Sequence, residues 1–219
     1  MIVNFLNLRL RWRQKFIYNK GNYMDFITST FKKIKTTSMR TSGHFGYALS
    51  HELNGHVLKI PFENERFSFY VIVPTTADGL AKLEGKLARH SLHLDQVLDS
   101  VVARDVVVEL PLLSVVGGVE LEEPLQKLGI KAAFSDDADF TEATPLKCNI
   151  GQAVHTPLID LGNNTPKNQG LEKIIGDKAE KLVKVKASHP FLFFVRDDLY
   201  GVLIIQGRML EPLNKTKSP

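Results

Sequence analysis

Residues 189–212, HPFLFFVRDDLYGVLIIQGRMLEP, decide the fold of this chain. Two apolar runs, Phe191–Val195 and Val202–Ile205, flank a short polar turn, which is the pattern of a β-hairpin. A lysine-rich stretch, Asn163–Ser188 (NNTPKNQGLEKIIGDKAEKLVKVKAS), separates it from the apolar segment Ala153–Leu161. Such a long connection inside a compact domain is generally functional or disordered. We therefore expect residues 163–188 to be what the protein presents to a partner.

The rest of the chain is predicted to be strand-rich, with short helices in its middle. Residues Leu6–Arg13 alternate apolar side chains with Asn and Arg, the period of a strand with one buried face. Residues Lys15–Met39 are polar and basic, with Phe16, Phe26 and Phe31 as isolated anchors. Further strands are expected at His56–Phe62, Phe67–Pro74 and Asp105–Pro111, and helices along Leu80–Leu87, Leu94–Val101 and Glu122–Leu128. This order of elements predicts an α+β fold and not alternating βαβ units.

Composition and motifs exclude several classes of function. The composition, 43% hydrophobic and 24% charged, is typical of a globular protein, and no run is long and apolar enough to cross a membrane. A net charge of +4 does not imply nucleic acid, but it permits weak attraction to acidic glycans.

No nucleophile elbow, phosphate-binding loop or metal-binding histidine pair is present, so we expect neither an enzyme nor a cofactor nor a metal site. Asp136, Asp137 and Asp139 lack the spacing of a calcium loop, and we expect a solvated acidic loop there. The single cysteine, Cys148, is expected to be a core or half-buried thiol.

Several blocks of the chain, in order and with matching gaps, resemble the serpin family. A Val-Asn pair near the start is followed by a Trp and two Phe residues at the spacing of that family. The resembling blocks are Val3–Asn4, Trp12, Phe16, Phe26, HVLKIPFENERFSFYVIVP (56–74), LEEPLQKLGIKAAFSDDADFTEAT (121–144), QAVHTPLIDL (152–161) and residues 189–212.

The resemblance implies a serpin-like fold of several β-sheets with an exposed reactive-centre loop at about residues 163–188. In inhibitory members a serine protease cuts this loop, which then inserts into the large sheet and carries the trapped protease with it. A count without gaps places the reactive bond at Ala179–Glu180, to within a couple of residues. Lys178 and Lys181 flank this bond, which suggests a trypsin-like protease as partner. The resemblance also assigns Asn4, Trp12 and His155 to the shutter and breach regions of the large sheet.

The hinge at the start of the loop departs from the family pattern. Inhibitory members carry small residues where this chain has Thr165, Pro166, Lys167 and Asn168. Proline cannot donate a hydrogen bond inside a sheet, and a buried unpaired Asn is unfavourable. The alternative to an inhibitor is therefore a non-inhibitory serpin with a substrate, binding, storage or chaperone-like role.

The resemblance begins inside the large sheet, so we expect a partial serpin domain over residues 1–213, without the N-terminal half, followed by a polar tail at 214–219. The exposed edge of such a fragment is expected to make it poorly soluble. The family resemblance implies an extracellular location, while the absence of a signal peptide at the start of this chain leaves an intracellular one open. Weak glycosaminoglycan binding is a third possibility, through Arg9–Lys15, Lys32–Lys35 or the loop lysines.

Overall fold

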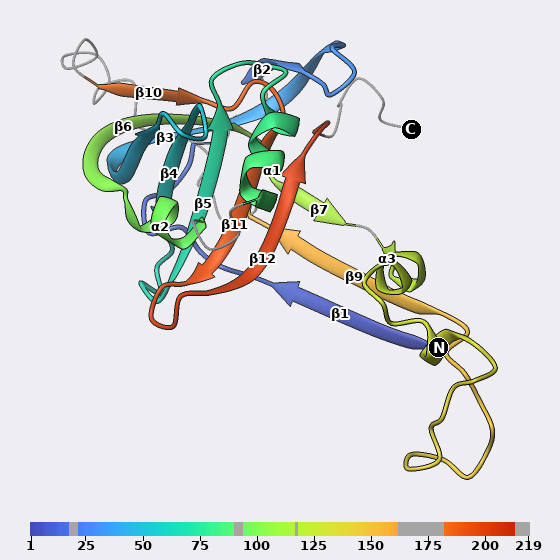
Figure 1. The fold of residues 1–219 in the computed structure, drawn as a ribbon. Coiled ribbons are helices and arrows are strands. Elements are labelled where there is room, and N and C mark those ends of the chain that lie inside the picture. The colour runs from blue at the N-terminus through green and yellow to red at the C-terminus, as the bar shows by residue number, and fades with distance from the viewer. Residues whose placement is uncertain (18–21, 90–93, 117, 162–181, 213–219) are drawn as a thin grey trace. The chain divides into compact units, whose positions relative to one another are not determined.

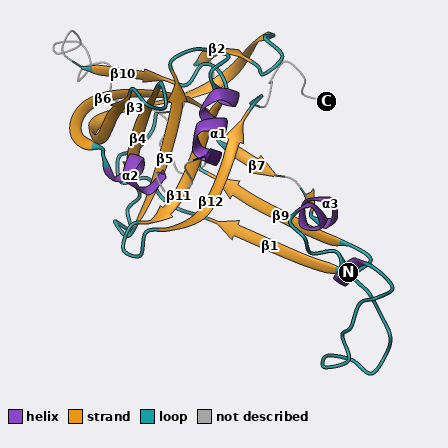
Figure 2. Ribbon diagram, in the orientation of Figure 1, coloured by secondary structure: helices purple, strands orange, loops and turns teal. Residues whose placement is uncertain are grey.

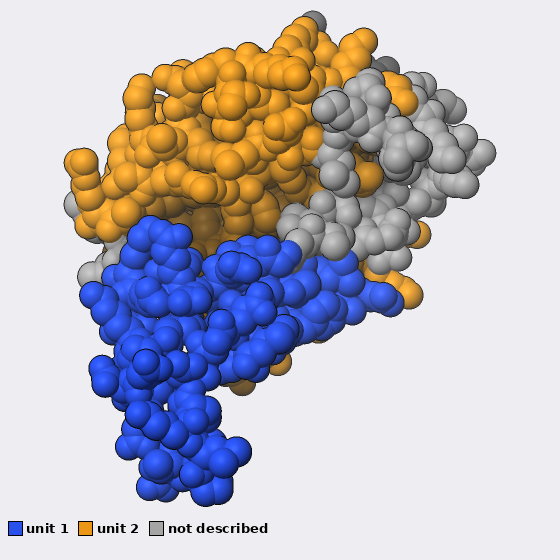
Figure 3. Space-filling view, turned by 90° about the vertical axis from the view of Figure 1, so that its right-hand side faces the viewer, with its two compact units in different colours: residues 1–9, 114–160 blue, residues 10–113, 161–219 orange. Residues whose placement is uncertain are grey.

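The computed structural model resolves two compact units that are rich in strands. It describes residues 1–17, 22–89, 94–116, 118–161 and 182–212. One unit comprises Met1–Arg9 and Ser114–Asp160, and the other comprises Leu10–Leu113 and Leu161–Pro219 (Figure 3). Strands predominate in both units and the helices are few and short (Figure 2), which confirms the predicted α+β class.

The smaller unit is built on a four-stranded sheet in which β1 and β9 run parallel (Figure 1). The strand order is β1-β9-β7, and β8 pairs with a further part of β9. Its elements are β1 (Ile2–Leu8), β7 (Ser114–Val116), β8 (Val119–Glu120), helix α3 (Glu122–Lys127), a 3-10 turn (Ala132–Phe134) and β9 (Ala153–Asp160). The helix predicted from Glu122 is confirmed, and Gly129, at φ +99°, ends it in a conformation that favours glycine.

The larger unit contains an eight-stranded sheet in the order β10-β6-β3-β4-β5-β11-β12, with β2 paired to β3. Its strands are β2 (Tyr23–Ile27), β3 (Lys33–Ser50), β4 (Gly55–Pro61), β5 (Phe67–Pro74), β6 (Val102–Pro111), β10 (Val183–Lys186), β11 (Phe191–Asp197) and β12 (Val202–Met209). Its helices are α1 (Leu80–Arg89) and α2 (Leu94–Asp99). The hairpin predicted at residues 189–212 is confirmed as β11–β12, and the strands predicted at His56–Phe62 and Phe67–Pro74 pair as the hairpin β4–β5.

Strand β5 lies at the centre of the hydrophobic core, with both of its faces buried. On one face Tyr70 and Ile72 join the cluster that includes Leu83 of α1 and Leu98 of α2. On the other face Phe69 stacks on Phe193 of β11, with ring centroids 5.9 Å apart. Every residue from Ser68 to Pro74 is buried, so the strand predicted at Phe67–Pro74 is covered on both of its faces.

Two predictions about the first fifty residues are wrong, and one strand was missed. The first strand spans Ile2–Leu8 and not Leu6–Arg13, although the arginines of that stretch are exposed as expected. The 18-residue strand β3 was not predicted, because its buried positions are mostly Thr, Ser and Met. Phe16 and Phe26 are fully buried anchors, but the side chain of Phe31 is 67% exposed.

The turn predicted after Val195 is shorter than expected, because Arg196 and Asp197 belong to β11 and are buried. Arg196 bridges to Asp95 and Asp99, which ties α2 to the sheet. Asp197 accepts two hydrogen bonds from Arg66, and this guanidinium lowers the pKa of Asp197. These charges are paired, as burial requires.

We predict opposite effects for two glycine-to-alanine changes. Gly207 faces Phe193 across the β11–β12 pair, and a Cβ there would overlap the aromatic ring. Gly207→Ala should therefore lower the free energy of unfolding by about 1–3 kcal/mol. Gly85→Ala, in α1 with nothing within 4 Å of its added Cβ, should raise it by about 0.5–1 kcal/mol. Urea unfolding followed by circular dichroism measures both; equal effects of the two changes would contradict this packing.

Candidate functional site

The single tryptophan, Trp12, forms the centre of an aromatic cluster and is 2% exposed. Its ring stacks on Phe62 at 4.7 Å, meets Phe69 edge-on at 5.5 Å and lies 4.9 Å from Phe16. Its backbone forms an isolated bridge with Phe62, which fixes the ring beside the β4–β5 hairpin. The indole is thus held rigidly, with only its N–H available for a polar contact.

That N–H anchors the chain at the point where the predicted loop begins. Trp12 Nε1 donates to the carbonyl oxygen of Leu161 at 2.7 Å, a buried hydrogen bond between residues 149 positions apart. The backbone N–H of Leu161 donates to Leu113 at 3.2 Å. Leu161 is therefore fixed through both of its backbone groups, and residue 162 begins the stretch outside the described residues.

The chain is also fixed where the described residues resume. Strand β10 pairs in parallel with β6, which places Val183 beside Val106. The N–H of Ala187 donates to Glu109 at 2.9 Å, and the carbonyl of Ser188 accepts from Ile27 at 2.8 Å. The backbone is thus held at Leu161 on one side of residues 162–181 and at β10 on the other.

In the smaller unit, Asn4 and His155 meet across the parallel pair of β1 and β9. They are register partners, and His155 Nδ1 lies 3.2 Å from Asn4 Oδ1. Because an amide oxygen only accepts, His155 donates from Nδ1. The ladder is continuous from Ile2, opposite Ala153, to Leu8, opposite Ile159. Any strand added between β1 and β9 would have to break this ladder and the Asn4–His155 contact.

A family model described as "Serpin (serine protease inhibitor)" matches residues 1–212. The chain belongs to the serpin family. This confirms the resemblance seen in the sequence, and membership of a family of protease inhibitors confirms that the chain is not an enzyme.

Curated serpins match the chain over nearly its whole length. Serine protease inhibitor 42Dd of Drosophila melanogaster is 26% identical over 215 residues, which cover 97% of this chain and 55% of the relative. Leukocyte elastase inhibitor of Bos taurus is 27% identical over 222 residues, covering 97% of this chain and 58% of the relative. The chain therefore spans a little over half the length of the curated relatives it matches.

Solved serpin structures share the fold of this chain. Uncleaved ovalbumin aligns with a TM-score of 0.81 at 22% identity, covering 94% of this chain and 56% of ovalbumin. Serpin48 of the insect Tenebrio molitor aligns with a TM-score of 0.76 at 24% identity, covering 97% and 56%. The serpin-like, multi-sheet fold expected from the sequence is confirmed.

The structure brings together only some of the predicted site residues. Asn4 and His155 are in contact, and Trp12 lies in the larger unit, bonded to Leu161. The predicted hinge (Thr165, Pro166, Lys167, Asn168) and reactive bond (Ala179, Glu180, with Lys178 and Lys181) lie outside the described residues. Sequence reasoning missed Leu161 and Ser188 as fixed points, because backbone groups leave no signal in side-chain identity.

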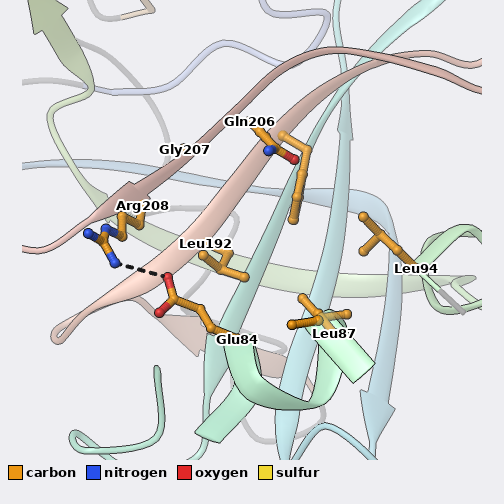
Figure 4. Close-up of a pocket in the computed structure, with 9 residues that line it drawn as sticks. Glu84, Leu87, Leu94, Leu192, Gln206, Gly207 and Arg208 are labelled. Carbon is orange, nitrogen blue, oxygen red and sulfur yellow. Dashed lines mark hydrogen bonds and ion pairs between the residues drawn. The ribbon is translucent and has the colours of Figure 1, made fainter. Parts of the chain in front are cut away.

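Other candidate centres do not coincide with these residues. An open pocket of about 540 Å³ lies between the helices and β11–β12, lined by apolar side chains such as Leu87 and Leu192 and closed at one rim by the Glu84–Arg208 ion pair at 3.5 Å (Figure 4). Cys148 is exposed, which corrects the expectation of a core or half-buried thiol, because it lies in a loop whose residues 145–149 are all exposed.

Within the described residues, no three His, Cys, Asp or Glu side chains come close enough together to hold a metal ion. None of the helices found there has the length and apolar character needed to cross a membrane.

Two histidines of the larger unit, His56 and His189, lie close to one another, and the pKa of each is lowered. Burial lowers the pKa of His189, which follows Ser188 directly. Burial also lowers the pKa of His56, and the nearby His189 lowers it further. Tyr47 lies 2.9 Å from Nδ1 of His56 and packs against its ring. Protonation of either imidazole would place charge in a partly apolar setting.

We predict that Trp12→Phe destabilises the larger unit through one lost hydrogen bond. The aromatic packing is largely kept, but the buried carbonyl of Leu161 loses its donor, which should lower the free energy of unfolding by about 1–3 kcal/mol. Trp12→Ala, which also empties the cluster, should cost about 3–5 kcal/mol. Because Trp12 is the only tryptophan, circular dichroism and not fluorescence should follow the unfolding. Wild-type stability in Trp12→Phe would show that the bond to Leu161 is dispensable.

We predict that stability falls as the pH drops below about 6.5, the ordinary pKa of histidine. Both imidazoles have lowered pKa values in the folded state, so the unfolded state binds protons first and is favoured by acid. The loss should continue until the pH falls below the folded pKa values. His56→Gln with His189→Gln should flatten this dependence in thermal melts between pH 7.5 and 5.5. The exposed control His44→Gln should keep it; a wild-type slope in the double variant would refute the assignment.

Proposed function

We propose that this serpin presents residues 163–188 to a trypsin-like serine protease, which cuts at or beside Ala179–Glu180. The observation that carries the proposal is the pair of fixed points, with Leu161 held by Trp12 on one side and β10 paired to β6 on the other. A protease that binds a segment between two fixed ends meets it at a defined place on the protein surface. Lys178 and Lys181 supply the basic side chains that a trypsin-like protease requires.

The names of two relatives support a protease as partner. They are called a serine protease inhibitor and a leukocyte elastase inhibitor. Because this chain spans only part of their length, inhibition of that protease by the whole protein is one candidate outcome of the cut. An extracellular site of action is part of the proposal, and it rests on the family resemblance alone.

The hinge favours a second candidate function, that of a serpin which is cut without trapping its protease. Insertion between β1 and β9 would place Pro166 in the interior of a sheet, where it has no N–H to donate. It would also bury the amide of Asn168, at a cost of about 1–3 kcal/mol if unpaired. The continuous β1–β9 ladder, with its Asn4–His155 contact, opposes the opening that insertion needs.

Incubation with a panel of trypsin-like and elastase-like proteases tests both candidates. We expect the trypsin-like proteases to cut within a couple of residues of Ala179, as read by mass spectrometry, and Lys178→Ala with Lys181→Ala to abolish the cut. An SDS-stable complex of higher mass identifies an inhibitor, and two fragments alone identify a substrate. For this hinge we expect fragments alone.

A hinge variant is the matched comparison. Pro166→Ala with Asn168→Ala removes both obstacles and should increase the thermal stability of the cut form relative to the cut wild type. Cleavage confined to sites outside residues 163–188 would contradict the proposed function.

A further inference from the structure

Phe31 occupies a position that stability does not explain. It lies in the tight turn between β2 and β3, where its side chain is 67% exposed and its φ is +59°. Bulky L-residues rarely adopt positive φ, since the Cβ crowds the backbone there. The exposed side chain of Phe31 therefore gains no stabilisation from burial, and its backbone conformation is strained.

The turn itself is well formed and does not need a phenylalanine. The N–H of Phe31 donates to Thr28 at 2.9 Å, and the N–H of Thr28 donates to Lys32 at 2.9 Å. This is a type of hairpin loop in which the residue with positive φ is ordinarily glycine. Retained strain at an exposed position points to a function that uses the side chain.

Phe31 stands at the tip of a basic face formed by the β2–β3 ribbon. On the outer side Tyr23 is 56% exposed, and Asp25 lies between Lys33, with which it pairs at 2.8 Å, and Lys35, its register partner. Lys33 lowers the pKa of Asp25 most, and Lys186 of β10, which pairs with Glu109 at 3.4 Å, is close enough to lower it further. We name this set (Tyr23, Asp25, Phe31, Lys33, Lys35 and Lys186) the ribbon surface.

The ribbon surface adjoins the fixed point at Ser188, where the chain that follows residues 162–181 is bonded to β2. Ile27, the last residue of β2, donates its N–H to Ser188, and β10 carries Lys186. The segment that the protease is proposed to cut is therefore joined directly to the ribbon surface through β10 and Ser188.

We propose that the ribbon surface docks an acidic patch on the trypsin-like protease that cuts the loop, with Phe31 inserted into an apolar recess of that protease. The proposal rests on the proposed function. Lys33, Lys35 and Lys186 outnumber the nearby acidic residues Asp25 and Glu109, and this net positive charge favours an acidic partner. An exposed aromatic ring is the side chain that a protein interface uses most effectively, and it favours a protein over a sulfated glycan.

The test compares loop cleavage in the intact chain with cleavage of a synthetic peptide of residues 162–188. The variant Lys33→Gln/Lys35→Gln/Lys186→Gln should slow cleavage of the intact chain about tenfold at low salt, and the difference should shrink at high salt. This variant breaks the ion pairs of Lys33 and Lys186. The control Lys82→Gln/Lys127→Gln/Lys147→Gln removes the same charge and also breaks two surface ion pairs, those of Lys82 and Lys127. It should leave the rate unchanged, and the peptide rate supplies the reference without docking.

Phe31→Gly separates docking from folding. It should slow cleavage about fivefold. Because it also relieves the strained turn, it should raise the melting temperature by ~2–4 °C. A merely structural role predicts the opposite sign for stability.

Each remaining result decides the proposal. Loop cleavage that is insensitive to both ribbon variants overturns docking and leaves the proposed function standing. An uncut loop in the wild type overturns both. Ribbon variants that weaken retention on heparin without slowing cleavage also overturn it, in favour of a glycan-binding surface.

Discussion

The hydrogen bond from the Trp12 indole to the carbonyl of Leu161 is the constraint on which the functional arrangement depends. It joins two parts of the chain that are 149 residues apart and is buried among Phe16, Phe62 and Phe69. In such surroundings an unpaired carbonyl is costly, so the bond fixes the backbone at Leu161, the last described residue before residues 162–181.

The rest of the larger unit supports that contact through strand β5. Phe69 reaches the Trp12 ring from one face, while Tyr70 and Ile72 pack under α1 and α2 on the other. Ion pairs of the buried Arg196 add to this packing, because they join α2 to β11 through Asp95 and Asp99. The core of the larger unit is thus one continuous set of contacts. Leu161 and β10, the two fixed points of the chain, are bonded to elements of this unit.

The proposed cleavage of residues 163–188 and their insertion between β1 and β9 would require different properties of the chain. Residues 163–188 are proposed to be cut by a protease, whereas Pro166 within them is unsuited to a central strand. The ladder between β1 and β9, including Asn4 and His155, is already complete. The proposed cleavage does not require insertion, and the ribbon surface concerns cleavage only.

The sequence by itself determined the family, the α+β class, the hairpin at residues 189–212 and the helix that begins at Glu122, because these depend on local periodicity, turn residues and ordered motifs. Only the tertiary structure decided that Trp12 bonds to Leu161, that β3 is a strand, and that Phe31 is exposed. Thr and Ser on β3 carry no hydrophobic signal, and a backbone acceptor such as Leu161 is not encoded in its side chain. Phe31 differs from Phe26 only in its place in a turn, which the hydrogen bonds of the folded chain impose.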